Sequence, residues 1–99
     1  MPAFVIVQIT IEDPVAYEGY KALASASIAQ YGGGYLIRGG QSELLEGGWQ
    51  PARLVVMEFT TVERAREWLT SPEYSAPKSI RHASARTEML LVEGVLQLT

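Results

Sequence analysis

Two charged side chains, Arg38 and Glu58, interrupt apolar runs that otherwise have the composition of buried strands. A buried charge is costly unless it is paired or hydrogen-bonded. The planar guanidinium of Arg38 would suit a substrate carboxylate or enolate. Glu58 would act as a general base if burial raised the pKa of its carboxyl group. The alternative is a structural ion pair that fixes strand register or dimer contacts.

Whether these two charges meet depends on how their strands pair. A hairpin with its turn centred on Gly48 places Gly40 opposite Glu58, and Arg38 one pair away. A β-bulge at the paired glycines Gly39 and Gly40 would bring the two charged side chains together. The sequence leaves three alternatives for them: an ion pair, two polar groups at a pocket mouth, or exposure to solvent.

His82 is the only histidine, and histidine is the one side chain that titrates near neutral pH without help from its neighbours. It follows Arg81 in a predicted helix whose buried side is marked by Ile80 and Ala83. At about 100° per residue, His82 falls at the border of that side or in solvent. His82 and Arg81 are therefore either surface residues or members of a pocket, where His82 would move a proton and Arg81 would bind substrate.

Five aromatic residues have two interpretations each. Tyr17, Tyr20 and Tyr31 lie on the apolar stripe of a predicted helix, and Trp68 and Tyr74 flank the sequence SPEY. Such spacing is typical of core packing. The alternative is that Tyr20, Trp68 and Tyr74 wall a cleft between helices and sheet, where tyrosine hydroxyls hydrogen-bond a ligand.

The composition is that of one small domain with more apolar surface than a single core can hide. The chain has 99 residues, of which 47% are hydrophobic and 19% are charged, whereas charged residues usually make up about 25%. A chain of this length buries only about 60–70% of its unfolded surface. We expect a single domain over residues 1–99 that is completed by a second copy of itself.

Several classes of partner are disfavoured. The basic residues are scattered and the formal net charge is −3, whereas nucleic-acid recognition needs a positive surface. There is no cysteine and only one histidine, which disfavours metal sites, and no nucleotide-binding motif is present. No apolar run reaches the about 18 residues that span a bilayer, and the start of the chain lacks the charged region of a signal peptide. We expect a cytoplasmic protein without metal, cofactor, nucleic-acid or membrane partners.

The pattern of apolar residues predicts four strands and two helical layers. Asp13 and Pro14 indicate a helix start, and the three glycines at 32–34 indicate its end. Thr60 to Glu63 has the form of a capping box, and Ser71-Pro72 is expected to stop the short helix with Ala65, Trp68 and Leu69. The expected strands are 4–11, 35–38, 53–59 and 88–95, and the second of them is expected to continue at Leu44-Leu45 after the glycines. Residues 46–49 are expected to form the hairpin turn, and the last helix is expected to cover 77–85.

This order, β-α-β-β-α-β, predicts an α+β fold of the ferredoxin-like type. Such a fold has a four-stranded antiparallel sheet with helices on one face. Strands 4–11, 53–59 and 88–95 are apolar on both faces, so the face opposite the helices needs another cover. A second sheet of the same kind is the simplest candidate.

Several motifs in register resemble one known family. They are YLIRGG at 35–40, LEGGWQP at 45–51, RLVVMEF at 53–59, SPEY at 71–74 and VEG at 92–94. Together they are similar to the domain-of-unknown-function 1330 family, within the superfamily of dimeric α+β barrels that includes antibiotic-biosynthesis-type monooxygenases and muconolactone isomerases. The resemblance implies a homodimer in which two sheets face each other. It implies no established reaction.

Two functional hypotheses follow from these residues. The first is a homodimer that binds a small acidic or enolisable molecule, and that as an enzyme would catalyse cofactor-independent proton transfer, isomerisation or oxygenation. Arg38 would then hold the anion and Glu58 or His82 would move a proton. The alternative is a non-enzymatic structural or stress-related dimeric module without a small-molecule site.

Overall fold

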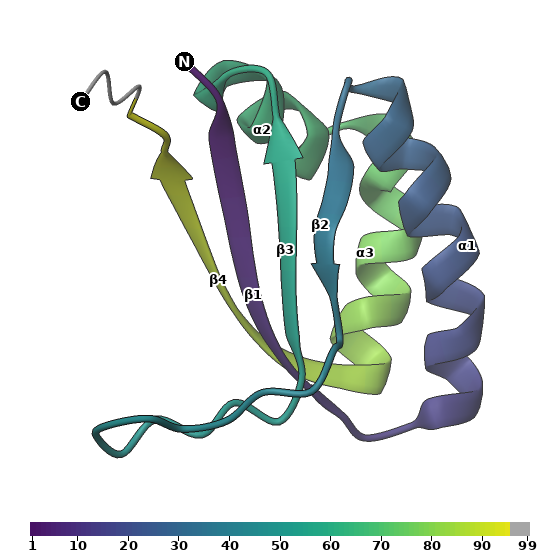
Figure 1. Ribbon diagram of the computed structural model, residues 1–99. Helices are drawn as coiled ribbons and strands as arrows, with labels where there is room; N and C mark the ends of the chain where they lie inside the picture. Colours follow the sequence, from purple (N-terminus) through teal and green to yellow (C-terminus); the bar gives the residue numbers. More distant parts are fainter. Residues whose placement is uncertain (96–99) are drawn as a thin grey trace.

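The computed structural model describes residues 1–95 and has the predicted α+β arrangement (Figure 1). Four strands form one antiparallel sheet in the order β2-β3-β1-β4, and the helices pack on one face of it. The elements are β1 (Ala3–Ile11), α1 (Pro14–Gln30), β2 (Gly34–Arg38), β3 (Leu54–Phe59), α2 (Val62–Leu69), α3 (Pro72–Ser84) and β4 (Ala85–Glu93). None of the helices within the described residues is long and apolar enough to cross a membrane.

Strand β1 positions the core because it is one of the two central strands of the sheet. It pairs with β3 from Ala3 to Gln8 and with β4 over its whole length. Its alternate residues Val5, Val7 and Ile9 are buried beneath the helices, as the period of two in a strand requires. The core is completed by β3 and by the helices, through Val55, Met57, Phe59, Tyr17, Tyr20, Ala24, Ile28, Ala65, Trp68 and Tyr74.

The opposite face of the sheet carries no helix. The pairing register aligns Ile37 with Val56, Val56 with Ile6, and Ile6 with Leu90. These four residues form an apolar row across all four strands, which we call the open-face row. Ile37 is 43% exposed and Leu90 is 60% exposed. Within residues 1–95 no helix covers this row, and Trp49 of the segment between β2 and β3 borders a hollow beside Ile6 and Leu90.

Helix α1 begins and ends where the sequence indicates. The Asp13 carboxylate accepts a hydrogen bond from the Ala16 amide at 3.2 Å, and Pro14 is the first helical residue. At the other end Gly32 takes a φ of 77° and the Gly33 amide donates to the Ile28 carbonyl at 2.9 Å.

The two shorter helices differ from the prediction at their starts. The cap of α2 is Thr61, whose hydroxyl accepts from the Arg64 amide at 3.1 Å, so the capping box expected from Thr60 is wrong by one residue. Ser71-Pro72, expected as a helix stop, begins α3: the Ser71 hydroxyl accepts from the Tyr74 amide at 3.1 Å. A Ser-Pro pair is equally suited to an N-cap and first helical residue. Helix α3 therefore starts at Pro72 and contains Pro77.

The segment between β2 and β3 is a long excursion and not a tight hairpin. Most of the segment 39–53 extends beyond the end of the sheet (Figure 1), and the expected strand at Leu44-Leu45 does not form. The register shift lies between Tyr35 and Ile37, so the bulge expected at Gly39-Gly40 is also misplaced. The last strand begins at Ala85, earlier than expected, because β4 pairs with β1 as far as Ile11.

Candidate functional site

The strand register separates Arg38 from Glu58. Arg38 is opposite Val55, whose side chain is buried on the helix-covered face. Glu58 is opposite Gly34 and Phe4 and lies half-buried on the open face. The contact considered from the sequence is therefore wrong, because β2 and β3 are joined by a long excursion and not by a turn centred on Gly48.

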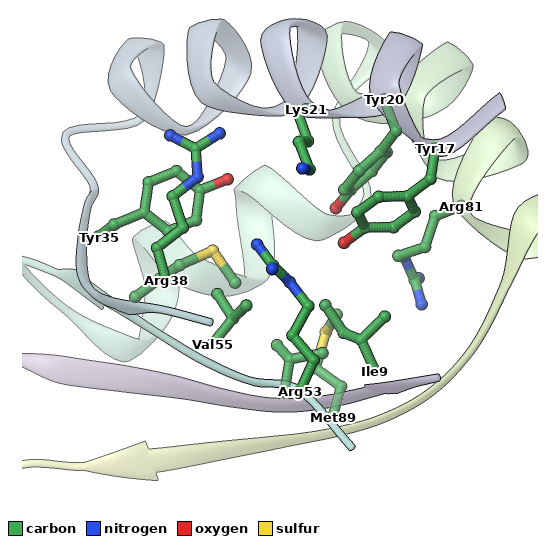
Figure 2. Close-up of a pocket in the computed structure, with 12 residues that line it drawn as sticks. Ile9, Tyr17, Tyr20, Lys21, Tyr35, Arg38, Arg53, Val55, Arg81 and Met89 are labelled. Atoms are coloured by element: carbon green, nitrogen blue, oxygen red, sulfur yellow. The ribbon is translucent and has the colours of Figure 1, made fainter. Parts of the chain in front are cut away.

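Arg38 instead lines a cavity between α1, α3 and the helix-covered face of the sheet (Figure 2). The cavity leaves about 20 Å³ for the centre of a water molecule, and the empty space in and around it, its open mouth included, is about 400 Å³. The lining consists of an apolar floor (Val7, Ile9, Val55, Met57, Met89), three tyrosines (Tyr17, Tyr20, Tyr35) and four cations (Lys21, Arg38, Arg53, Arg81). The cavity as it stands holds about one water molecule, so a ligand enters only when side chains of the lining move.

The charge of the lining is entirely positive. Within residues 1–95 no aspartate or glutamate lines the cavity, although the chain as a whole has a net charge of −3. Only Lys21 contacts a carboxylate, that of Glu18 at 3.0 Å on the exposed side of α1. Arg38 donates to the Ser25 hydroxyl at 3.1 Å, and its guanidinium lies 4.3 Å from the centre of the Tyr35 ring. Such a cluster of like charges is relieved by an anion.

Of the four cations, Arg53 is the most informative about the site. Its Nε is buried and has no hydrogen-bond partner in the described part of the chain. Its guanidinium lies against Gly39, where an added Cβ would be 2.5 Å from the Arg53 Cζ. The Arg53 carbonyl accepts from the Ile9 amide at 2.8 Å, which ties its backbone to β1. An unpaired buried donor is costly, so the site lacks an acceptor at this point.

The buried end of the cavity holds a chain of hydrogen bonds. The Tyr20 and Tyr74 hydroxyls are 2.6 Å apart, and Arg81 Nε donates to the Tyr74 hydroxyl at 3.2 Å. Arg81 also donates to the Thr87 hydroxyl, and its Nη2 is 3.2 Å from His82 Nε2. Burial raises the pKa of both the Tyr20 and the Tyr74 hydroxyl. Both phenols are therefore neutral at physiological pH.

The other predicted site residues lie outside the cavity. Trp68 is fully buried behind it, 4.2 Å from Tyr74 between ring centres, and its indole nitrogen donates to the Ser27 hydroxyl at 3.1 Å. His82 is exposed on α3, and Ala83, expected on the buried side of that helix, is exposed as well. Catalytic roles for Glu58 and His82 stay predictions.

The sequence did not single out Lys21, Arg53, Tyr17 or Tyr35 as site residues. A signal for Arg53 was present, since Arg38 and Arg53 stand at the two ends of the β2–β3 segment. Paired strands bring such ends together. The five alternate residues of β1, β3 and β4 beneath them supply the apolar floor. Among residues 1–95, no group of three His, Cys, Asp or Glu could hold a metal ion.

Solved structures with the same fold include proteins of unknown function and an oxygenase. The RPA0582 protein from Rhodopseudomonas palustris, of unknown function, has a TM-score of 0.79 and 15% identity, covering 97% of this chain and 84% of its own. SnoaB, a cofactor-independent oxygenase from Streptomyces nogalater, has a TM-score of 0.65 and 18% identity, covering 98% and 96%. A dimeric protein of unknown function and ferredoxin-like fold from Bacteroides fragilis has a TM-score of 0.54 and 14% identity, covering 94% and 96%. At these identities the likeness concerns the fold alone.

A family model covers nearly the whole chain. Among curated proteins, none matches the sequence. The model of the family described as domain of unknown function (DUF1330) matches residues 2–95. These residues include every strand, every helix and the whole lining of the cavity. The chain therefore belongs to the DUF1330 family.

Proposed function

We propose that the protein is a homodimer that binds a small, partly apolar acid in the cavity between the helices and the sheet. The observation that carries this proposal is the lining itself: four cationic side chains and no carboxylate over an apolar floor. The unpartnered Nε of Arg53 supports it, because a bound carboxylate would supply the missing acceptor. Arg38 and Lys21, at the more open end, would complete the anion site.

The apolar floor limits the rest of the ligand. Its side chains come from β1, β3 and β4, and they offer no hydrogen-bonding group apart from the weakly accepting sulfurs of Met57 and Met89. A short hydrocarbon portion fits such a surface. Because the cavity has room for about one water molecule, Arg38 and Lys21 must shift outward when a ligand enters.

The open-face row supports the homodimer. Ile37 and Leu90 are large apolar side chains in contact with solvent, and they continue the row of Val56 and Ile6 across the sheet. A second copy of the same face would cover this row with matching residues, since a two-fold interface is self-complementary. Light scattering coupled to gel filtration tests the mass directly.

The acid site is tested with a matched pair of ligands, hexanoate and hexanamide. They share a hydrocarbon chain and differ in the charge of the end group. Titration calorimetry or ligand-observed NMR should give at least about tenfold tighter binding of hexanoate, because charge-assisted hydrogen bonds contribute about 1.5–3 kcal/mol. The Arg38→Gln variant should lose this preference, while Arg86→Gln, which is outside the cavity, should keep it. Equal binding of both ligands would contradict an acid site, and binding of neither would favour a purely structural module.

A further inference from the structure

The hydrogen-bond chain at the buried end of the cavity has a defined direction. Arg81 can only donate, so its Nε–H occupies the oxygen of Tyr74. The Tyr74 hydroxyl proton then needs an acceptor, and in the described residues its hydroxyl has one other hydrogen-bond partner, the Tyr20 oxygen at 2.6 Å. Tyr74 is fully buried, so the reverse arrangement would leave its proton unpaired at a cost. Tyr74 therefore donates to Tyr20.

This direction leaves the proton of Tyr20 free. Tyr20 is 7% exposed and lines the cavity, and Figure 2 shows its hydroxyl directed into the space between α1 and the sheet. Hydrogen bonds aligned from Arg81 through Tyr74 to Tyr20 polarise one another, which strengthens the last donor in the chain. The Tyr20 hydroxyl is thus a preorganised neutral hydrogen-bond donor in the cavity, in addition to the cations.

The two kinds of donor lie at different ends of the cavity. In the view of Figure 2, Arg38 is on one side, Tyr20 and Arg81 are on the other, and Lys21 and Arg53 lie between them. Burial follows the same order, since Arg38 is exposed whereas Tyr20 and Arg81 are buried. A ligand that satisfies both ends needs an acid at one end and a second oxygen acceptor further along its chain.

We propose that Tyr20 donates a hydrogen bond to a carbonyl oxygen of the ligand, that Tyr74 is its positioning residue, and that the ligand is an oxo acid. This inference rests on the acid-binding function proposed above and names the class of acid. Arg81 takes part through Tyr74 and does not itself hold the carboxylate. An enol or enolate oxygen at the same point would accept the same hydrogen bond, as in other sites where a tyrosine stabilises an oxyanion.

The raised pKa of the Tyr20 hydroxyl agrees with this role. Burial of the hydroxyl is the main cause of this shift in pKa. A phenol with a raised pKa keeps its proton, so it is a donor at any physiological pH. The selectivity for an oxo acid should therefore be unchanged between about pH 6 and pH 9.

The test compares hexanoate with its 2-oxo, 4-oxo and 5-oxo derivatives. These acids have the same carbon chain and one carboxylate, and they differ in the presence and position of a ketone. At least one oxo acid should bind the wild-type protein about five- to tenfold more tightly than hexanoate. The ratio of the two affinities is the readout, because general damage to the cavity weakens both ligands.

Three variants test which residue causes the difference in affinity between the oxo acid and hexanoate. Tyr20→Phe should bring the affinity ratio to about one, and Tyr74→Phe should lower it by a smaller factor, because Tyr20 then loses its orienting partner. Arg86→Gln, an exposed residue outside the cavity, should keep both affinities and their ratio. Thermal melting confirms that each variant is folded.

The outcomes separate this inference from the proposed function. If all the acids bind the wild-type protein equally and Tyr20→Phe changes nothing, the acid site stands and the oxo-acid inference is wrong. If hexanoate and the oxo acids all fail to bind, both proposals are wrong. A ratio that persists in Tyr20→Phe would move the carbonyl contact to another donor and overturn the role of Tyr20.

Discussion

The two faces of the sheet carry different sets of charges. The helix-covered face gathers Arg38 and Arg53 around a cavity without carboxylates, whereas Glu58 and Glu88 lie on the open face beside the open-face row. The same four strands supply both faces, and the alternation of side chains decides which charge goes where. The difference agrees with the two proposals, a small-anion site on one face and a cover of apolar surface on the other.

The largest expected effect concerns the open face. Leu90→Glu would place an unpaired charge within the proposed interface, at the β4 end of the open-face row, which costs several kcal/mol. We expect the dimer to dissociate at micromolar concentration, measured as a halved mass by light scattering. Leu45→Glu is the control, since Leu45 is 87% exposed in the β2–β3 segment. A dimeric Leu90→Glu variant would show that the sheet faces do not meet.

The buried end of the cavity should control stability in alkali. Burial raises the pKa of the Tyr20 hydroxyl above 10.0, the ordinary value for a tyrosine, so the folded protein keeps a proton that the unfolded chain loses. The protonated hydroxyl makes its full contribution to the free energy of unfolding below pH 10. This contribution is lost as pH rises further, by up to about 1.4 kcal/mol per pH unit for each such group. The free energy of unfolding, measured with urea between pH 9 and pH 11, should fall less steeply with pH for Tyr20→Phe than for the wild type. Identical slopes would contradict the burial of this hydroxyl.

Gly39 offers a matched pair of substitutions at the mouth of the cavity. Its φ is 75°, and a Cβ there would meet the Arg53 guanidinium. We expect Gly39→Ala to lower the free energy of unfolding by about 1–2 kcal/mol and to weaken hexanoate binding. Gly40→Ala has no heavy atom within 4 Å of its added Cβ and should leave binding unchanged. If the two variants bind hexanoate alike, the position of Arg53 does not matter for binding.

Arg53→Met should separate stability from binding. It removes the unpartnered Nε and one of four clustered cations. The free energy of unfolding of the ligand-free protein, measured by heat or urea, should therefore rise by about 1 kcal/mol. The same variant should bind hexanoate more weakly. Arg86→Met, at an exposed ion pair with Glu12, should change stability by at most about 0.5 kcal/mol. A less stable Arg53→Met protein would mean that Arg53 has a structural partner and does not bind a ligand.

Much of the fold could be predicted from the sequence, because local signals and the tertiary structure agree. The alternation in β1, the Asp13-Pro14 start of α1 and the glycines after it each have one physical interpretation. Ser71-Pro72 has two, since the same pair can end one helix and begin the next, and only the hydrogen bond of the Ser71 hydroxyl to the Tyr74 amide distinguishes them. The start of β4 at Ala85 was set by its long-range pairing with β1.

The candidate site could be predicted only in part. Arg38, Tyr20 and Arg81 line the cavity, and Tyr74 contacts two of them, but their roles in binding stay predictions. Arg53 was not proposed, because it was assigned to the start of a strand and its neighbours in space are distant in the chain. Glu58 was placed near Arg38 by an assumed turn that the protein does not have.

The sequence by itself determined the order of the elements, the apolar faces of the strands and the family. These properties depend on side chains a few residues apart, and their patterns are visible in one dimension. The tertiary structure decided which charges share a face, because a shift of one residue in strand pairing moves every side chain to the other side of the sheet. The bulge at Leu36 and the long segment between β2 and β3 set that register. They place Arg38 and Arg53 over one cavity and leave Glu58 on the far side of the sheet.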